Sequence, residues 1–245
     1  MFLRSATILK NKSNNISTYP FSIPSIKGSN SINFNSEVTF FVGENGSGKS
    51  TLLEAIAFQC GFNTAGGGVN NMYEVESSNS TLGDHIRLSW LPKINQGFFL
   101  RAESFYHFAS YIDKLSEDSP DIFRSYGGKS LHQQSHGEAF FNLFKNRFGQ
   151  NGIYLLDEPE AALSPARQLA LLRIIKQLVD EGKSQFIIAT HSPILLGYPE
   201  SQILNFDTSP ISEVAYEGTD HYQIMKGFLN RRELYLKELF KEDIE

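Results

Sequence analysis

The sequence predicts an α/β fold built around a mainly parallel β-sheet, on three observations. Apolar runs of strand length alternate with segments of helical periodicity along most of the chain, which is typical of parallel strands joined by crossover helices. A glycine-rich turn, GENGSGKST at 43–51, lies between one such strand and helix. Another apolar strand, IYLL, ends in Asp157 and Glu158. Because ligands gather at the carboxyl ends of parallel strands, these features predict one site at one sheet edge.

The bulk composition limits the classes of protein that the chain can belong to. Its 245 residues, 40% hydrophobic and 20% charged, fit a globular protein with a single domain spanning 1–245. Cys60 is the one cysteine, so no internal disulfide forms and a reducing, cytoplasmic compartment is expected. No stretch approaches the roughly 20 apolar residues of a membrane helix, so no direct membrane insertion is expected. The net charge of -5 argues against a broad nucleic-acid face but leaves room for a local basic patch.

Each element has its own local signal. Strands are favoured where apolar runs end at turn residues, over 37–42, 85–91, 97–101, 152–159 and 185–190. Helices are favoured where apolar residues recur at helical spacing, over 49–59, 102–117, 139–148, 165–180 and the tail from about Asp220. Ser164 and Pro165 are good N-cap and first-turn residues for the fourth of these. The segment 19–26, YPFSIPSI, is expected to be an edge strand or a loop, because proline cannot donate to a strand ladder.

The turn at 43–51 matches the full phosphate-binding loop pattern, two glycines five residues apart followed by Lys49 and Ser50. Such a loop turns backbone N–H groups inward around phosphates, and the helix after it directs its positive end at them. Lys49 is expected to reach the β- and γ-phosphates, Ser50 to offer its hydroxyl to Mg²⁺, and Thr51 to meet the α-phosphate. The residues expected to bind nucleotide are therefore Gly43, Glu44, Asn45, Gly46, Ser47, Gly48, Lys49, Ser50 and Thr51.

Polar residues at two other strand ends are candidates for the chemistry. Asp157 is expected to hold Mg²⁺, directly or through water, and Glu158 to act as the general base that polarises the attacking water. The alternative is a solvated acidic turn, and Glu160 fits that alternative better. His191 follows the strand FIIAT and is expected to contact the γ-phosphate. The remaining histidines singled out are expected to be surface or packing residues: His85, His107, His132 and His221.

At these motifs the chain resembles the ATP-binding cassette (ABC) ATPase superfamily, and most closely the branch of RecF-like, SMC and double-strand-break-repair ATPases. GENGSGKST corresponds to Walker A, IYLLDEP to Walker B, EAALS at 160–164 to the D-loop, and His191 to the switch histidine. SHGE at 135–138 resembles the LSGGQ-like signature, with histidine and glutamate replacing a glycine and the glutamine. More narrowly, YPFSIP, RAESF, SHGE and DEPEAALSP are similar to a small group of stand-alone predicted bacterial ATPases.

The resemblance implies an ABC-type head with a small helical lobe at about 103–148 and an antiparallel N-terminal strand region. It implies that Ser135 and the backbone N–H of Gly137 bind the γ-phosphate of ATP held by a second copy, so that ATP drives a head-to-tail homodimer. Glu103 would take the Q-loop position, with Gln96 as the other candidate. The adenine would stack on one of two aromatic residues, Tyr19 or Phe21.

The function that follows is Mg²⁺-dependent binding and hydrolysis of ATP. The stretch between Glu103 and Ser135 is too short for the long coiled coil of repair-type relatives, so the chain is expected to act as an ATPase head with an unidentified partner protein. The resemblance points to a DNA-related process, repair or defence, in which nucleic acid could be bound. The alternatives are the nucleotide-binding subunit of a membrane transporter and a nucleotide switch with little turnover.

Overall fold

A six-stranded sheet forms the centre of the computed structural model, which describes residues 1–12, 17–64, 66–68, 82–118, 120–149, 151–181 and 183–241. Its strand order is β5-β6-β7-β3-β8-β9. The first five strands run parallel, and β9 is antiparallel to β8. This confirms the predicted mainly parallel sheet. The bounds are β5 Gly97–Arg101, β6 Ile153–Asp157, β7 Gln185–Ala189, β3 Val38–Val42, β8 Gln202–Asn205 and β9 Ser212–Glu213.

The central strands are apolar because both of their faces are covered. Every residue of β3, β6 and β7 is buried, as expected for parallel strands between two layers. Successive side chains point to opposite faces, so that Phe40 packs in the core on one side and Phe41 in the core on the other. The large sheet therefore separates two hydrophobic cores.

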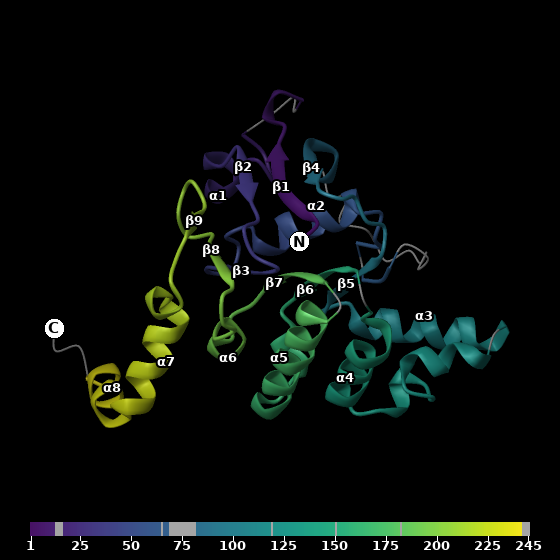
Figure 1. Ribbon diagram of the computed structural model, residues 1–245. Coiled ribbons are helices and arrows are strands. Elements are labelled where there is room, and N and C mark those ends of the chain that lie inside the picture. Colours follow the sequence, from purple (N-terminus) through teal and green to yellow (C-terminus); the bar gives the residue numbers. More distant parts are fainter. Residues whose placement is uncertain are drawn as a thin grey trace.

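A small antiparallel sheet and helix α2 (Lys49–Gln59) cover one face of the large sheet (Figure 1). The small sheet has the order β2-β1-β4, with bounds Ser31–Asn33, Leu3–Ile8 and Ile86–Trp90. This confirms the expected antiparallel N-terminal strand region. Buried residues of α2, among them Leu52, Leu53 and Ile56, lie between the two sheets.

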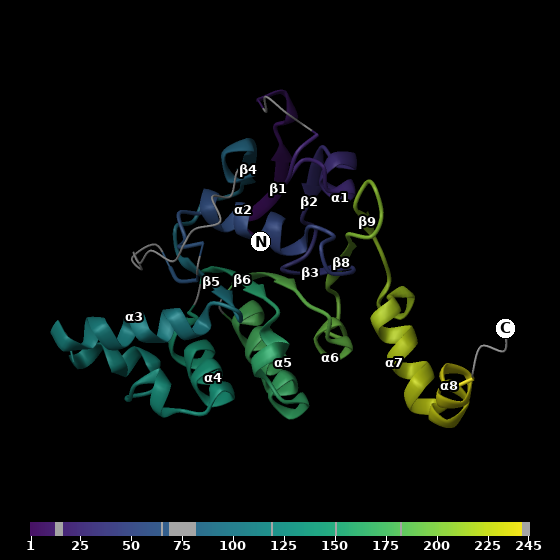
Figure 2. The ribbon, with the colours of Figure 1, turned by 180° about the vertical axis from the view of Figure 1, so that it is seen from behind.

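The opposite face is covered by α3 (Phe105–Asp118), α4 (His136–Arg147), α5 (Pro165–Asp180) and α6 (Pro193–Leu196). Aromatic rings hold this layer together: Phe144 packs edge-on to Phe148, whose ring stacks on Tyr154 of β6 at a centroid distance of 4.2 Å. The segment with α3 and α4 extends sideways beyond β5 (Figures 1 and 2). Short 3₁₀ helices connect these elements at Lys10–Lys12, Gly83–His85, Pro120–Tyr126, Leu131–Gln133, Pro159–Ala162 and Tyr216–Gly218.

The C-terminal helices α7 (Asp220–Asn230) and α8 (Arg232–Leu239) lie beyond the opposite edge of the sheet from α3 (Figures 1 and 2). None of their residues is buried. They carry five of the exposed large hydrophobic residues, Ile224, Met225, Leu229, Leu234 and Leu239, and Phe240 follows directly after α8. In the described part of the chain, no helix combines the length and the apolar character needed to cross a membrane.

The structure differs from the sequence-based expectation mainly in short elements. The segment 19–26 is no strand: it forms turns and then α1 (Pro24–Gly28), where Pro24 takes the first helical position that suits its fixed φ. Helix α4 begins at His136, three residues earlier than expected, because Ser135 and Glu138 cap its start. Strands β1, β2, β8 and β9 have between two and six residues and little periodicity. Most of the glycine-rich loop after α2 lies outside the described residues.

Gln185 joins the small sheet to the large one. Its side chain is fully buried at the start of β7. The Oε1 atom accepts hydrogen bonds from the backbone N–H groups of Phe2 and Leu3 at 2.9 and 2.8 Å, and Nε2 donates to the carbonyl of Leu3 at 3.0 Å. One side chain thus satisfies three backbone groups that would otherwise be buried without partners.

Replacing Gln185 with Leu keeps the volume but removes these three hydrogen bonds. We expect the free energy of unfolding to fall by about 3 kcal/mol, because leaving a buried backbone group unsatisfied costs roughly 1–3 kcal/mol. Urea denaturation followed by circular dichroism measures the change. The control is Gln177→Leu at an exposed position of α5, which should stay within about 0.5 kcal/mol of wild type. A Gln185→Leu protein as stable as this control would contradict the bridging role.

Candidate nucleotide-binding site

The site is organised by the ends of three neighbouring parallel strands. Ala189, the last residue of β7, lies in register with Phe41 of β3 and with Asp157 of β6. Beyond the ladder, the backbone N–H of Glu158 donates to the carbonyl of Ala189 at 2.9 Å, and that of Thr190 donates to the carbonyl of Phe41 at 3.2 Å. The glycine loop, the acidic pair and His191 therefore leave the sheet at one edge.

The glycine loop is held in shape by side chains on both sides of it. Gly48 is the N-cap of α2 and has a φ of 102°, and a Cβ at this position would lie 3.1 Å from the Ile23 and Ser25 side chains. The Ser25 hydroxyl donates to the carbonyl of Ser47. On the other side, Asp207 Oδ1 accepts a hydrogen bond from the backbone N–H of Glu44 at 2.8 Å. The loop conformation is therefore preformed by its surroundings, and it needs glycine at position 48.

Lys49 and Ser50 lie where the phosphate-loop pattern requires them. The Lys49 side chain is buried, and its Nζ donates to the carbonyls of Gly43 and Glu44 at 2.7 and 2.9 Å. Burial lowers the pKa of Lys49, and the nearby carboxylates of Glu158, Asp207, Asp157 and Glu44 raise it in opposition. Ser50 Oγ donates to Asp157 Oδ1 at 2.9 Å. This hydrogen bond joins the segment after β3 to the end of β6, and it links the two residues predicted to hold Mg²⁺.

Asp157 is almost fully buried beside Arg101, the last residue of β5. Burial raises the pKa of Asp157 to about 6, although the Ser50 hydrogen bond and the Arg101 charge act in the other direction. Arg101 contacts three carboxylates, those of Asp157, Glu54 and Glu103, at 3.5, 3.3 and 3.4 Å. Glu103 is exposed and follows the carboxyl end of β5, which is level with Asp157 at the end of β6. Gln96 precedes β5, at the opposite edge of the sheet.

Glu158 has a backbone conformation that only a few non-glycine residues adopt, with φ 50° and ψ 51°. Such strain costs on the order of 1–3 kcal/mol and is found most often at functional sites. The conformation places the carboxylate so that its Oε1 is 3.7 Å from His191 Nε2. His191 Nε2 itself is buried and has no hydrogen-bond partner among the described residues. A polar nitrogen and a carboxylate thus face the same space beside the loop.

Glu160 is no solvated surface acid, contrary to the sequence-based expectation. Its Oε1 accepts a hydrogen bond from the backbone N–H of His191 at 2.6 Å. Burial raises the pKa of Glu160, opposed by this hydrogen bond and one from the Thr190 side chain. The segment after β6 is therefore tied to the segment after β7 through a buried carboxylate.

His221 also differs from the expectation of a surface or packing residue. It lies in the first turn of α7, and its Nε2 is 2.9 Å from Nδ1 of His191. Burial lowers the pKa of both rings, and the Lys49 charge lowers them further. These effects favour the neutral form of both histidines. His85 by contrast packs edge-on against Phe21, and His132 contacts Ser110, both away from these strand ends.

The two candidate aromatic residues for adenine are distinguished by their exposure. Phe21 is buried in the core that contains α2. Tyr19 is 69% exposed, and its hydroxyl lies 3.2 Å from Thr51 Oγ1 at the start of α2. Of the pair, Tyr19 is the exposed residue, and its hydroxyl contacts the start of α2 directly after the glycine loop.

The signature-like stretch 135–138 forms the start of α4. Ser135 is exposed, and its backbone N–H and Oγ both donate to Glu138 Oε2, at 3.1 and 2.8 Å. These hydrogen bonds lower the pKa of the Glu138 carboxyl. A Cβ on Gly137 would lie 2.3 Å from Arg167 Nη1 in α5 and 2.9 Å from the carbonyl of Ala162, so this glycine permits close packing of α4 on α5 and on the segment before it. Of the donors expected to hold a phosphate from a second copy, those of Ser135 are thus engaged by Glu138.

The arrangement beside the glycine loop fits a magnesium-bound nucleotide. Ser47 Oγ, like His191 Nε2, is buried without a hydrogen-bond partner among the described residues, and a phosphate oxygen or ribose hydroxyl could supply one. No group of three or more His, Cys, Asp or Glu side chains in the described ranges could by itself hold a metal. Ser50 and Asp157 match the usual Mg²⁺ site, in which one or two protein ligands are completed by phosphate oxygens and water.

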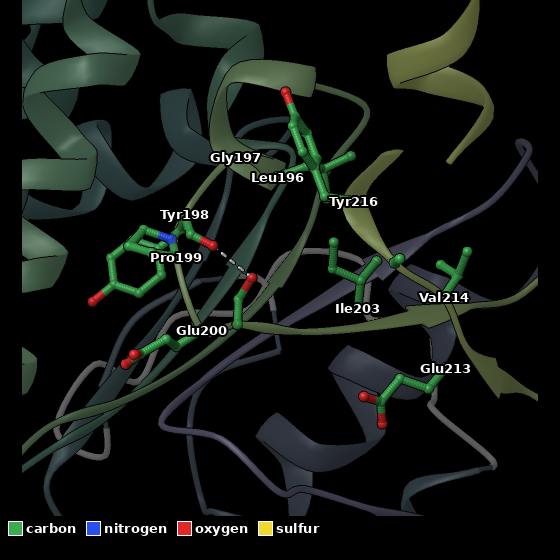
Figure 3. Close-up of a pocket in the computed structure, with 11 residues that line it drawn as sticks. Leu196, Gly197, Tyr198, Pro199, Glu200, Ile203, Glu213, Val214 and Tyr216 are labelled. Atoms are coloured by element: carbon green, nitrogen blue, oxygen red, sulfur yellow. Dashed lines mark hydrogen bonds between the residues drawn. The ribbon is translucent and has the colours of Figure 1, made fainter. Parts of the chain in front are cut away.

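A separate pocket of about 580 Å³ lies away from these residues (Figure 3). Its lining comes from the segment after α6, including Tyr198 and Glu200, and from the segment that leads toward α7, including Glu213 and Tyr216. None of the residues predicted to bind nucleotide lines it. The pocket therefore has no part in the candidate site.

Three residues at the site were missed by sequence reasoning for different reasons. Asp207 follows β8, and an acid after an apolar strand is the same signal that identified Asp157, but β8 has only four residues. Glu160 follows the acidic pair and was assigned to the solvated turn. His221 follows a good N-cap, Thr219, yet no sequence spacing relates it to His191.

Comparison with known proteins agrees with this geometry. A family model described as an AAA ATPase domain matches residues 131–196. A second, described as an AAA domain, putative AbiEii toxin, type IV TA system, matches residues 38–120. Protein Ea59 of Escherichia phage lambda is 38% identical over 72 residues, which is 28% of this chain and 14% of that protein. The matched segment thus spans a small part of its relative.

Two solved structures are similar to this chain, and the first of them shows the same fold. An ATP-binding cassette of an ABC transporter in its ADP conformation is similar over 96% of this chain and 99% of its own, with a TM-score of 0.50 and 17% identity. The SMC head domain from Thermotoga maritima is similar over 88% of this chain and 100% of its own, with a TM-score of 0.45 and 19% identity. Residues 38–120 and 131–196 thus match models of AAA-type ATPase domains, and the fold is that of an ATP-binding cassette.

Proposed function

We propose that the protein binds ATP with Mg²⁺ at residues 43–51 and hydrolyses it. The observation that carries the proposal is the meeting of four groups at one sheet edge. They are Lys49 in a preformed glycine loop, Ser50 hydrogen-bonded to Asp157, the strained Glu158, and the Nε2 of His191, which has no hydrogen-bond partner in the part of the chain that the structure describes. A solvated acidic turn would bring no lysine, serine and histidine to the same place.

Each group has a role that follows from its position. Backbone N–H groups of the loop and the positive end of α2 bind the phosphates. Lys49 exchanges its two carbonyl hydrogen bonds for phosphate oxygens, and Ser50 and Asp157 hold Mg²⁺. When bound, the metal ion neutralises phosphate charge. The exposed ring of Tyr19 provides the surface on which adenine stacks.

Glu158 acts as the general base. Its carboxylate is half-exposed, so water can reach it, and it faces His191 Nε2. The carboxylate accepts a proton from the water that attacks the γ-phosphorus, while the bond from phosphorus to the bridging oxygen breaks and ADP leaves. His191 donates a hydrogen bond to the γ-phosphate. Positioned acid–base groups of this kind contribute roughly 10²–10⁴ in rate.

We further propose that the working unit is a head-to-tail dimer. Ser135 of one copy then binds the γ-phosphate held by Lys49 of the other copy. In the free chain the Ser135 donors are engaged by Glu138, so the Glu138 side chain has to rotate away when phosphate arrives. Glu138 is exposed, which allows this rotation without disturbing the core.

The proposal for the process that the ATPase serves is based on its sequence motifs. We propose a DNA-related role in repair or defence with a partner protein, based on the resemblance of the motifs to RecF- and SMC-type ATPases. The fold itself does not discriminate, because it is shared with a transporter cassette. A transporter subunit or a slow nucleotide switch are the alternative functions.

Substitution of Glu158 and Lys49 tests the two halves of the activity separately. Glu158→Gln should lower ATP turnover by at least about 100-fold while ATP still binds, because the amide cannot accept the proton. Lys49→Ala should weaken ATP binding by about tenfold or more, because it removes hydrogen bonds from a charged donor. Phosphate release and calorimetric titration with Mg-ATP measure these effects.

The control for charge removal is Lys176→Ala, an exposed lysine of α5 paired with Asp180, which should leave both quantities unchanged. Turnover by Glu158→Gln at the wild-type rate would contradict the role of Glu158. Running the wild-type assay with and without duplex and single-stranded DNA separates the functions: stimulation favours the DNA-related role, and tight ATP binding with negligible turnover favours the switch.

Mixing two inactive variants tests the dimer. Ser135→Asp keeps a good N-cap for α4 but places a negative charge where the partner's γ-phosphate should lie. When the Ser135→Asp protein is mixed with the Lys49→Ala protein, turnover that neither variant has alone should return. The reason is that the mixed dimer contains one site with an intact Lys49 from one copy and an intact Ser135 from the other. A mixture with no more activity than the sum of its components would show that Ser135 does not act on the neighbouring copy.

A further inference from the structure

The contacts of His191 define its ring orientation from two directions. The Glu160 carboxylate accepts a hydrogen bond from the backbone N–H of His191 at 2.6 Å. The ring then contacts His221 through Nδ1 at 2.9 Å and faces Glu158 through Nε2 at 3.7 Å. The two imidazole rings are 5.1 Å apart with an interplanar angle of 51°. His191 is thus held between a carboxylate and a second histidine that sequence reasoning did not place at the site.

The shared hydrogen bond between the two rings requires that one nitrogen donates and the other accepts. In a neutral imidazole one nitrogen carries the proton and the other has a lone pair. A lone pair on His191 Nε2 would face the Glu158 carboxylate and repel it, whereas an N–H at that position is attracted. The proton of His191 is therefore favoured on Nε2, which leaves Nδ1 as the acceptor and His221 Nε2 as the donor.

The position of His221 is fixed by the way α7 is attached. Thr219 caps α7 and also donates to the carbonyl of Tyr216 at 2.7 Å. The Tyr216 hydroxyl donates to the carbonyl of Pro193 at 2.9 Å, and its ring packs against Tyr222 at 4.6 Å. Figure 3 shows Tyr216 lining the pocket together with Leu196 and Gly197 at the end of α6. The start of α7 is thus anchored to residues 191–193, the segment that carries the histidine.

We propose that His221 is a positioning residue that holds the proton of His191 on Nε2, the nitrogen that faces Glu158 and the γ-phosphate. The inference rests on the proposed ATPase function for its kinetic consequence, but the proton position itself does not depend on that function. His221 touches neither phosphate nor water in this role. It acts only through His191.

The kinetic test compares His221→Phe, which keeps an aromatic ring but cannot donate, with His221→Gln, whose amide can donate. His221→Phe should lower kcat by about two- to tenfold, the value of one net hydrogen bond, with the KM for ATP within about twofold of wild type. His221→Gln should recover most of the loss. Ile224→Ala, at an exposed position of α7, is the control for disturbance of the helix and should match wild type.

The second readout needs no activity. In protein with ¹⁵N-labelled histidine and no nucleotide, the His191 signals, assigned by their loss in His191→Asn, should show a protonated Nε2 and an unprotonated Nδ1. In His221→Phe this preference should weaken, and in His221→Gln it should return. Protonation at Nδ1 in wild type, or the same Nε2 preference and the same kcat in His221→Phe, would overturn the proposal.

These two readouts separate the inference from the proposed function. A wild-type protein that does not hydrolyse ATP but shows the Nε2 proton, lost in His221→Phe, would defeat the ATPase proposal and support the positioning role. If the protein instead hydrolyses ATP through Glu158, and the His191 proton stays on Nε2 in His221→Phe, the ATPase proposal is supported and the positioning role is defeated.

Discussion

The parallel pairing of β3, β7 and β6 is the constraint on which the rest of the structure depends. Ala189 lies in register with residues of both neighbouring strands, so the three strands end at one level. Their fully buried side chains fix this register, because a shift by one residue would turn every side chain to the opposite face. The glycine loop, the acidic pair and His191 are consequently neighbours, although they are far apart in the sequence.

The electrostatics of the edge are those of a site prepared for a cation and a polyphosphate. The carboxylates of Asp157, Glu158 and Asp207 lie around one buried lysine. The Arg101 guanidinium forms ion pairs with Asp157 and Glu54 and so offsets part of this negative charge. Burial raises the Asp157 pKa to about 6. The protonated carboxyl therefore stabilises the fold at low pH, and this contribution is lost as pH rises through about 6. A divalent cation would compensate the ionised carboxylate at higher pH.

The long elements and the motif residues could be predicted from the sequence because local signals determine them. Helix α2 and strand β5 have the predicted bounds, and the phosphate-loop pattern places Lys49 and Ser50 without reference to distant residues. The rest depends on tertiary contacts. The segment 19–26 reads as an irregular proline-rich stretch, yet its function in the fold is to support the loop through Ser25 and Ile23. His221 and Glu160 reach His191 only because α7 and the segment after β6 pack beside it, and no spacing in the sequence encodes that.

The most direct test of the central claim is a crystal structure of the protein with Mg²⁺ and a non-hydrolysable ATP analogue. The account predicts the triphosphate in the loop 43–51, with Lys49 on its terminal phosphates, Mg²⁺ between Ser50 and Asp157, and Glu158 and His191 facing the γ-phosphate. An empty loop at saturating analogue, or a nucleotide bound elsewhere with these side chains apart, would contradict it.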